Sequence, residues 1–220
     1  LVEQGYDVVG ITMRLWTEAR PEGFSGKTLC CGIEDIDDAR RVAQVLDIPH
    51  YTLNLEQPFK RFVVDRFVED YANGVTPNPC LNCNTYIKFD LFLERALALE
   101  ADYMATGHYA RRVEVAAGVQ LHIAADPQKD QSYVLYTLSQ EALDRCLFPV
   151  GDLVKFDVRE IASRYGLAVA EKPDSADICF VPNGDYREFV GSRVADRPGT
   201  IIDRDGTVLG EHLGVQNFTV

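Results

Sequence analysis

The sequence predicts an α/β fold in which helices flank a parallel sheet, followed by the start of a small β-rich domain. Two features of the first part predict the α/β fold. Short β-branched runs recur along the chain, and they alternate with segments whose apolar residues lie at helical spacing, as in parallel β-α-β units. The third feature is a change of texture from about residue 183, where the turn dipeptides Pro198-Gly199 and Asp205-Gly206 separate short β-runs.

The first two strand–helix alternations are the clearest. Residues 6–13 form a β-branched run that predicts a buried strand. Residues 34–46 place apolar side chains at helical spacing, with acidic residues early and arginines late, as the helix dipole favours. A second strand is expected at 50–55. The helix after it carries an apolar stripe of Phe59, Phe62, Val63, Phe67 and Tyr71, with Gly74 placed as a C-terminal cap.

Less regular segments follow. Residues 76–84 (T-P-N-P-C-L-N-C-N) are rich in turn formers and predict a loop.

Ligands bind at the carboxyl ends of parallel strands, so a ligand site is expected near Met13, after Leu55 and at Gly107-His108. The other expected elements are a helix at 85–99, a strand at 101–106, a hairpin at 111–124 around Gly118, helices at 132–147 and 157–165 with Gly166 capping the second, a strand at 168–171, and β-runs at 200–202 and 207–209.

The composition is that of an ordinary globular chain of 220 residues, with 46% hydrophobic and 25% charged residues. No apolar run reaches the roughly 20 residues that span a bilayer, and no secretory leader opens the chain. The chain starts at Leu1 rather than methionine, so we expect an internal fragment. The formal charge of −12 and the lack of a basic arm argue against a nucleic-acid partner, although an acidic protein can still carry a local basic face.

Six cysteines are the most informative residues. In a long chain without a secretory leader, cysteines are more often reduced, metal-bound or catalytic than paired in structural disulfides. Cys80 and Cys83 form a C-x-x-C motif, which fits a redox pair, half a metal site or two small buried side chains. Cys83 precedes Asn84, a candidate N-cap. A thiol at a helix N-terminus has a lowered pKa, so Cys83 is expected to be a nucleophile or ligand.

The other candidate residues are ambiguous when each is taken alone. Cys179, among apolar neighbours, fits simple packing, and Cys146 at a helix end is expected to be structural. The adjacent Cys30 and Cys31 fit metal binding or no role, because neighbouring cysteines rarely bond to each other. Gly107 fits either close ligand approach or an ordinary turn. His108 could be a base or a structural histidine, and Lys129-Asp130-Gln131-Ser132 fits a helix cap.

Taken together, the motifs resemble one family over nearly the whole chain. T-P-N-P-C-L-N-C-N, then I-K-F, A-T-G-H-Y, K-D-Q-S-Y, F-P-V-G and D-S-x-x-I-C-F occur in this order and spacing in tRNA-specific 2-thiouridylases. The resemblance implies a PP-loop ATP pyrophosphatase fold related to the Rossmann architecture over 1–182, and the start of a central domain over 183–220. The family's S-G-G-x-D-S phosphate loop and C-terminal β-barrel are absent from this chain, so the fragment alone is expected to be inactive.

The resemblance also implies an activity and the residues for it. Such an enzyme uses ATP with Mg²⁺ to adenylate the wobble uridine of tRNA at the C2 oxygen, then replaces that oxygen with sulfur from a sulfur-carrier protein or cysteine desulfurase. It would act in the cytoplasm, away from membranes. The residues match the family as follows: Cys83 the attacking cysteine, Cys179 the persulfide cysteine with which it can form a disulfide, Met13 and Gly107 the adenine-nucleotide contacts, Asn78, Pro79 and Cys80 the target-base segment, and Lys129, Asp130 and Gln131 a tRNA-contacting segment.

Three alternatives stay open. Cys80 stands where some members of the family have aspartate, so Cys80, Cys83 and Cys179 could instead hold a [4Fe–4S] cluster with one iron open to sulfide. A zinc-stabilised binding module could use Cys30, Cys31, Cys80 and Cys83. Another PP-loop adenylating ligase is the third alternative, and the cysteine pair argues against it because amide-forming ligases need no thiols.

Overall fold

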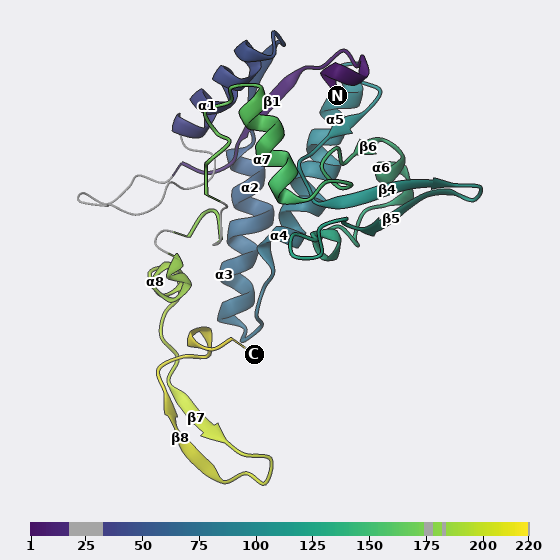
Figure 1. Cartoon of the computed structure of the whole chain (residues 1–220). Helices are drawn as coiled ribbons and strands as arrows, with labels where there is room; N and C mark the ends of the chain where they lie inside the picture. Colours follow the sequence, from purple (N-terminus) through teal and green to yellow (C-terminus); the bar gives the residue numbers. More distant parts are fainter. Residues whose placement is uncertain (18–32, 174–177, 182–183, 220) are drawn as a thin grey trace.

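The strands of the first part pair in parallel, as predicted. The computed structural model describes residues 1–17, 33–173, 178–181 and 184–219 (Figure 1). Strand β1 (Gly10–Arg14) pairs in parallel with β2 (His50–Asn54), and helix α1 (Ile33–Val45) lies between them in the chain. The predicted α1 and β2 are confirmed, while β1 begins four residues later than the β-branched run.

A second parallel pair lies further along the chain and corrects one prediction. Strand β3 (Met104–Ala105) pairs with β6 (Cys146–Leu147), at the end of the segment predicted as a helix over 132–147. That helix prediction is wrong. The segment contains only the 3₁₀ turn Ser132–Val134 and helix α6 (Gln140–Asp144). The Ser139 side chain accepts the N–H of Ala142, which starts a new helix instead of continuing the first.

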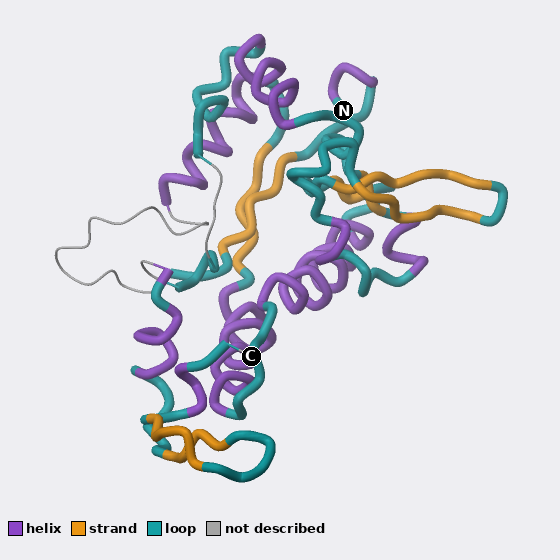
Figure 2. The backbone as a smooth tube through the Cα atoms, turned by 60° about the horizontal axis from the view of Figure 1, so that its bottom comes forward, coloured by secondary structure: helices purple, strands orange, loops and turns teal. Residues whose placement is uncertain are grey.

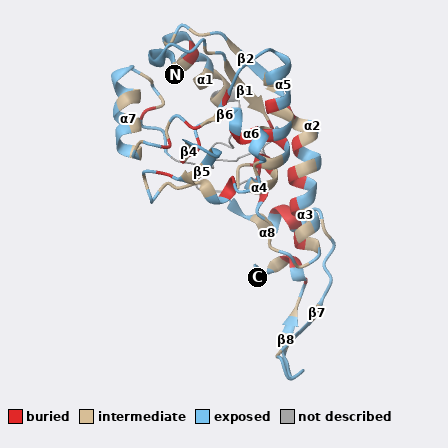
Figure 3. Ribbon diagram, turned by 90° about the vertical axis from the view of Figure 1, so that its right-hand side faces the viewer, coloured by how far each residue is buried: buried red, intermediate tan, exposed pale blue. Residues whose placement is uncertain are grey.

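The apolar stripe predicted over residues 59–71 is confirmed. Helix α2 (Glu56–Phe59), the π-helix Lys60–Val64 and helix α3 (Asp65–Ala72) follow one another without a break. Figure 3 shows buried residues along one side of these consecutive helices. Phe59 and Phe67 are fully buried, and burying each such ring stabilises the fold by about 1.5–3 kcal/mol. Gly74 has a φ of +73°, as a helix-ending glycine should.

The helix that carries the C-x-x-C motif begins earlier than predicted. Helix α4 (Pro79–Asn82), the π-helix η3 (Cys83–Phe92) and helix α5 (Leu93–Ala98) are continuous. The loop predicted to Asn84 therefore ends at Asn78, whose side chain accepts the N–H of Cys80 at 3.1 Å. Proline suits the first position of a helix because its fixed φ is already helical and its missing N–H would have no partner there.

The predicted hairpin is present, and the two predicted β-runs near the end of the chain pair as a second hairpin. Strand β4 (Ala110–Val115) pairs antiparallel with β5 (Gly118–Ile123), and β7 (Gly199–Ile202) pairs antiparallel with β8 (Val208–His212). Figures 1 and 2 show that the two hairpins project from different parts of the molecule. The β7–β8 hairpin agrees with the β-rich texture predicted after residue 183.

The region before and after Cys179 mixes confirmed and wrong predictions. Helix α7 (Lys155–Arg164) is present, with φ +65° at Gly166. Residues 168–171 form turns instead of the predicted strand, because the N–H of Ala170 donates to Leu167 O. The short helix α8 (Tyr186–Gly191) was not predicted and is capped by the Asp185 side chain. The domain boundary expected between residues 182 and 183 lies outside the described residues.

Two hydrophobic clusters form the interior, and the C-x-x-C helix contributes to both. The first cluster contains Cys83 and Ile87 of this helix together with Phe67 and Phe180. The second contains Phe89 and Leu93 of the same helix, together with residues of β3 and β6. Among the described residues, no helix has both the length and the apolarity that a membrane span requires.

Candidate functional site

Cys83 lies inside its helix and not at the helix N-terminus. The helix begins at Pro79, one turn earlier, and Cys83 is 9% exposed. Asn84 is not an N-cap: its side chain is 1% exposed, and its Nδ2 donates to Val134 O at 2.9 Å. Burial raises the pKa of the Cys83 thiol, the Lys88 ammonium opposes this rise, and Cys80 adds a smaller increase. The prediction of a thiolate stabilised by a helix end is therefore wrong.

Cys83 and Cys179 belong to the same hydrophobic cluster. Cys83 is one of its buried members, and Cys179 is partly buried and packs against it. Phe180, next to Cys179, is 1% exposed. Its ring lies 5.7 Å from that of Phe59 and 5.2 Å from that of Phe67, both edge-on. These contacts hold the backbone beside Cys179 against helices α2 and α3, whose Phe59 and Phe67 belong to the same cluster as Cys83.

The two residues matched to nucleotide contacts lie on strand β1 and in the loop after strand β3. Met13 of β1 is partly buried and packs against the cluster that contains Cys83. Gly107 follows β3, and no protein atom lies within 4 Å of the place where a Cβ would stand. Packing within the described protein therefore does not require glycine at 107. Close approach of a ligand to the backbone stays a prediction for this position.

His108 is a hydrogen-bonding residue of the interior. It is 8% exposed, with Nδ1 2.8 Å from Thr106 Oγ1 and Nε2 3.3 Å from Lys88 Nζ. Burial, followed by the charge of Lys88, lowers the pKa of His108 to about 3. A lysine ammonium can only donate a hydrogen bond, so Nε2 of His108 is the acceptor from Lys88. The ring proton is therefore on Nδ1, and this N–H donates a hydrogen bond to Thr106 Oγ1. This arrangement fits a structural role for His108 better than a role as a catalytic base.

The segment matched to tRNA contact is tied to the loop after β3. The Gln131 side chain accepts the N–H of Tyr109 at 3.0 Å, and the Gln131 N–H donates to Tyr109 O at 2.8 Å. The carboxylate of Asp130 accepts the N–H of Ala124 at 2.8 Å and the hydroxyl of Ser132 at 2.7 Å. These side chains hold the fold locally, and Asp130 is not a helix cap of the predicted kind because no long helix follows.

The segment matched to the target base begins the C-x-x-C helix. Asn78 serves as its N-cap, Pro79 is buried, and Cys80 is exposed. The pKa of the Cys80 thiol is raised, chiefly by desolvation of the sulfur, and Lys88 partly offsets this effect. The two thiols of the motif thus differ: Cys80 reaches the surface, whereas Cys83 faces the interior.

The described cysteines do not form a metal site. Among residues 1–17, 33–173, 178–181 and 184–219, no three cysteine, histidine, aspartate or glutamate side chains form a group that could hold a metal ion. The structure therefore does not bring Cys80, Cys83 and Cys179 together as ligands of a [4Fe–4S] cluster. Cys30 and Cys31, invoked for a zinc module, lie outside the described residues. Cys146 is fully buried, and burial raises the pKa of its thiol to about 12, as expected for a structural cysteine.

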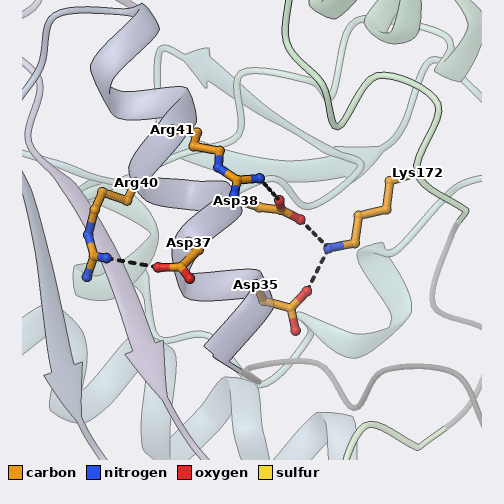
Figure 4. A network of polar contacts seen from close by, with 6 residues as sticks. All are labelled: Asp35, Asp37, Asp38, Arg40, Arg41 and Lys172. Atoms are coloured by element: carbon orange, nitrogen blue, oxygen red, sulfur yellow. Dashed lines mark hydrogen bonds and ion pairs between the residues drawn. The ribbon is translucent and has the colours of Figure 1, made fainter.

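An ion-pair network joins α1 to the segment that precedes Cys179, and the sequence did not suggest it. Lys172 Nζ lies 2.7 Å from Asp35 Oδ1 and 2.8 Å from Asp38 Oδ2 (Figure 4). These hydrogen bonds, first to Asp35 and then to Asp38, raise the pKa of Lys172. The carbonyl of Lys172 also accepts from Arg159 of α7 at 3.5 Å. Lys172 thus connects three segments upstream of the cysteine.

Replacing Lys172 with methionine is expected to lower the free energy of unfolding by about 1 kcal/mol. Half-exposed ion pairs contribute modestly, and this substitution removes two of them at once, those with Asp35 and Asp38. Arg41→Met is the matched control, because the Arg41 side chain is 71% exposed and lies 3.8 Å from Asp38. We expect this substitution to leave the free energy of unfolding almost unchanged. Urea unfolding at low and high salt measures both. A Lys172→Met loss that equals the control, or that salt does not reduce, contradicts the ion-pair role.

The chain is similar to known proteins over its whole length. Residues 1–183 match the family described as the tRNA methyl transferase HUP domain. The whole chain is similar to proteins named tRNA-specific 2-thiouridylase MnmA: 49% identical to that of Magnetococcus marinus, 50% to that of Moorella thermoacetica and 49% to that of Paracoccus denitrificans. The chain spans 62%, 62% and 57% of the length of these relatives.

Proposed function

The chain belongs to the tRNA methyl transferase HUP domain family, and from this premise we propose that the protein is an ATP-dependent tRNA 2-thiouridine synthase. The family description mentions methyl transfer, but the similar relatives are named for thiolation. The presence of two cysteines in one cluster agrees with thiolation, because sulfur transfer through a persulfide and a disulfide needs two thiols.

The proposed reaction proceeds in two stages. ATP, with Mg²⁺, adenylates the C2 oxygen of the wobble uridine and releases pyrophosphate. A sulfur-carrier protein or cysteine desulfurase places a sulfur on Cys179 as a persulfide. The Cys83 thiolate then attacks the sulfur of Cys179, forming the Cys83–Cys179 disulfide and releasing hydrosulfide. Hydrosulfide attacks C2, AMP leaves with the oxygen, and an external thiol reduces the disulfide.

One observation supports this proposal above the others: Cys83 and Cys179, from distant parts of the chain, pack into one hydrophobic cluster. The proposed exchange needs two sulfur atoms that can meet. Phe180 anchors the backbone next to Cys179 to this cluster. Met13 packs against the same cluster and is proposed, with Gly107, to contact the adenine nucleotide.

The remaining assignments follow the same scheme. Asn78, Pro79 and Cys80 are proposed to meet the target base, at the exposed start of the C-x-x-C helix. The segment from Lys129 to Gln131 is proposed to contact the tRNA next to the loop after β3. Residues 1–182 are proposed as the catalytic domain and residues 183–220 as the start of a central domain. Because its substrate would be tRNA, the protein is proposed to act in the cytoplasm.

The test is direct detection of the product. The full-length protein is incubated with unmodified tRNA, ATP, Mg²⁺ and a cysteine desulfurase with cysteine, and the digested tRNA is analysed by mass spectrometry. We expect 2-thiouridine at the wobble position, formed only with ATP and with release of AMP. A methylated base in the presence of a methyl donor, or AMP release without any thiolated nucleoside, contradicts the proposal.

A further inference from the structure

Lys88 is a half-buried cation without a carboxylate partner. In the part of the chain that the structure describes, no aspartate or glutamate oxygen lies within 4.0 Å of its ammonium, and its hydrogen-bond partner is His108 at 3.3 Å. Lys60 differs, with Asp65 at 2.6 Å, and so does Lys172 with two carboxylates. The chain carries twelve more acidic than basic residues, so carboxylates are plentiful. An unpaired cation withdrawn from water indicates a place for an anion.

His108 orients this cation without neutralising it. The imidazole is buried against the rings of Phe89 and Phe148, at centroid distances of 5.8 and 6.3 Å. Its other nitrogen is fixed by Thr106 Oγ1 at 2.8 Å. A carboxylate at this position would cancel the lysine charge, whereas a neutral histidine accepts one hydrogen bond and leaves the charge intact. The ammonium is therefore positioned and still electrostatically available.

The π-helix brings the side chains of Lys88 and Cys83 closer to the same side of the helix than an α-helix would. In an α-helix, side chains five residues apart diverge by about 140° around the axis. Residues 83–92 form the π-helix η3, in which the N–H of residue i+5 donates to the carbonyl of residue i, so Lys88 comes round toward the side of Cys83. The effect of Lys88 on both thiols of the motif, lowering the pKa of each against the effect of burial, agrees with this placement.

We propose that Lys88, held by His108, is the charge-stabilising residue for the sulfur anion that forms at Cys83 during sulfur transfer. The proposal rests on the proposed function for the reaction and adds a residue to it. Cys83 must lose its proton to attack the sulfur of Cys179, and it must do so in a buried position. An adjacent ammonium compensates part of the cost of placing a negative sulfur there. When the disulfide forms, the negative charge passes to the released hydrosulfide, which Lys88 can also attract.

Charge variants at position 88 test the proposal in the full-length protein. Lys88→Met should lower the single-turnover rate of 2-thiouridine formation by about 10²-fold, with the Kd for tRNA and the KM for ATP almost unchanged. Lys88→Arg, which keeps the charge, should restore most of the rate. Lys60→Met is the matched control, the same substitution at an exposed, ion-paired lysine, and should behave as the wild type.

A second readout does not depend on the proposed function. The rate at which iodoacetamide alkylates Cys83 at neutral pH, followed by peptide mass spectrometry without ATP or tRNA, should fall by about three- to tenfold in Lys88→Met, while alkylation of Cys179 stays the same. If the wild type makes no 2-thiouridine but Lys88→Met slows alkylation, the proposed function fails, whereas stabilisation of the Cys83 thiolate by Lys88 stands. An unchanged alkylation rate, a raised KM for ATP, or no rescue by arginine overturns the role of Lys88.

Discussion

Replacing Cys83 with serine is expected to lower the rate of tRNA thiolation by roughly 10³-fold or more, because a serine hydroxyl cannot attack the persulfide at neutral pH. Binding of tRNA should be nearly unchanged, since Cys83 is 9% exposed and offers little surface to a macromolecule. The measurement is single-turnover formation of 2-thiouridine, with tRNA affinity measured in parallel. Thiolation retained in this variant would remove the thiol mechanism.

Cys146→Ser is the matched control for this substitution. Cys146 is also buried, so both variants place a hydroxyl in an apolar environment, at a cost of about 1–3 kcal/mol. Only Cys83 belongs to the cluster that Cys179 contacts; Cys146 lies in the second cluster, on β6. We expect the two variants to lose similar stability and only Cys83→Ser to lose activity. A folded but inactive Cys146→Ser protein would mean that the cysteine roles are misassigned.

Elements with a long periodic pattern were predicted well from the sequence. The stripe from Phe59 to Tyr71 repeats over several turns, and four of its five members, all but Phe62, are buried in the first cluster. Both hairpins were marked by glycine and by turn residues that adopt the expected conformations, as Gly118 and Gly206 do with φ of +122° and +85°. In these segments the local preference and the tertiary contacts favour the same structure.

The start of the C-x-x-C helix was missed because asparagine and proline favour turns and helix N-termini alike. The pair Asn78-Pro79 fits an N-cap followed by N1, and this signal was present in the sequence. The helix was instead predicted to start at residue 85 with Asn84 as its N-cap, and the pKa of Cys83 was therefore predicted to be lowered, whereas burial raises it. The contact of Lys88 with His108 could not be predicted in the same way, because it depends on how β3 meets the helix and on the wider π-helical turn.

Replacing Cys179 with serine is also expected to abolish thiolation, but it should stop the reaction at a different step. Cys179 is partly exposed, whereas Cys83 is buried, so a sulfur donor reaches Cys179 more easily. Sulfur labelled with ³⁵S and supplied by a cysteine desulfurase should therefore accumulate on Cys83→Ser protein, at Cys179. Cys179→Ser protein should take up none, while ATP-dependent adenylation of tRNA and tRNA binding continue.

Comparing the two cysteine variants separates the two roles. A persulfide acceptor and an attacking thiol are both essential to the overall reaction, so loss of product alone cannot distinguish them. The label can distinguish them, because Cys179 acquires the sulfur before the disulfide forms and releases it only when the disulfide forms. Label that appears on Cys83 in Cys179→Ser protein would reverse the assignment. Label that appears on neither variant would show that sulfur reaches the uridine without passing through this pair of cysteines.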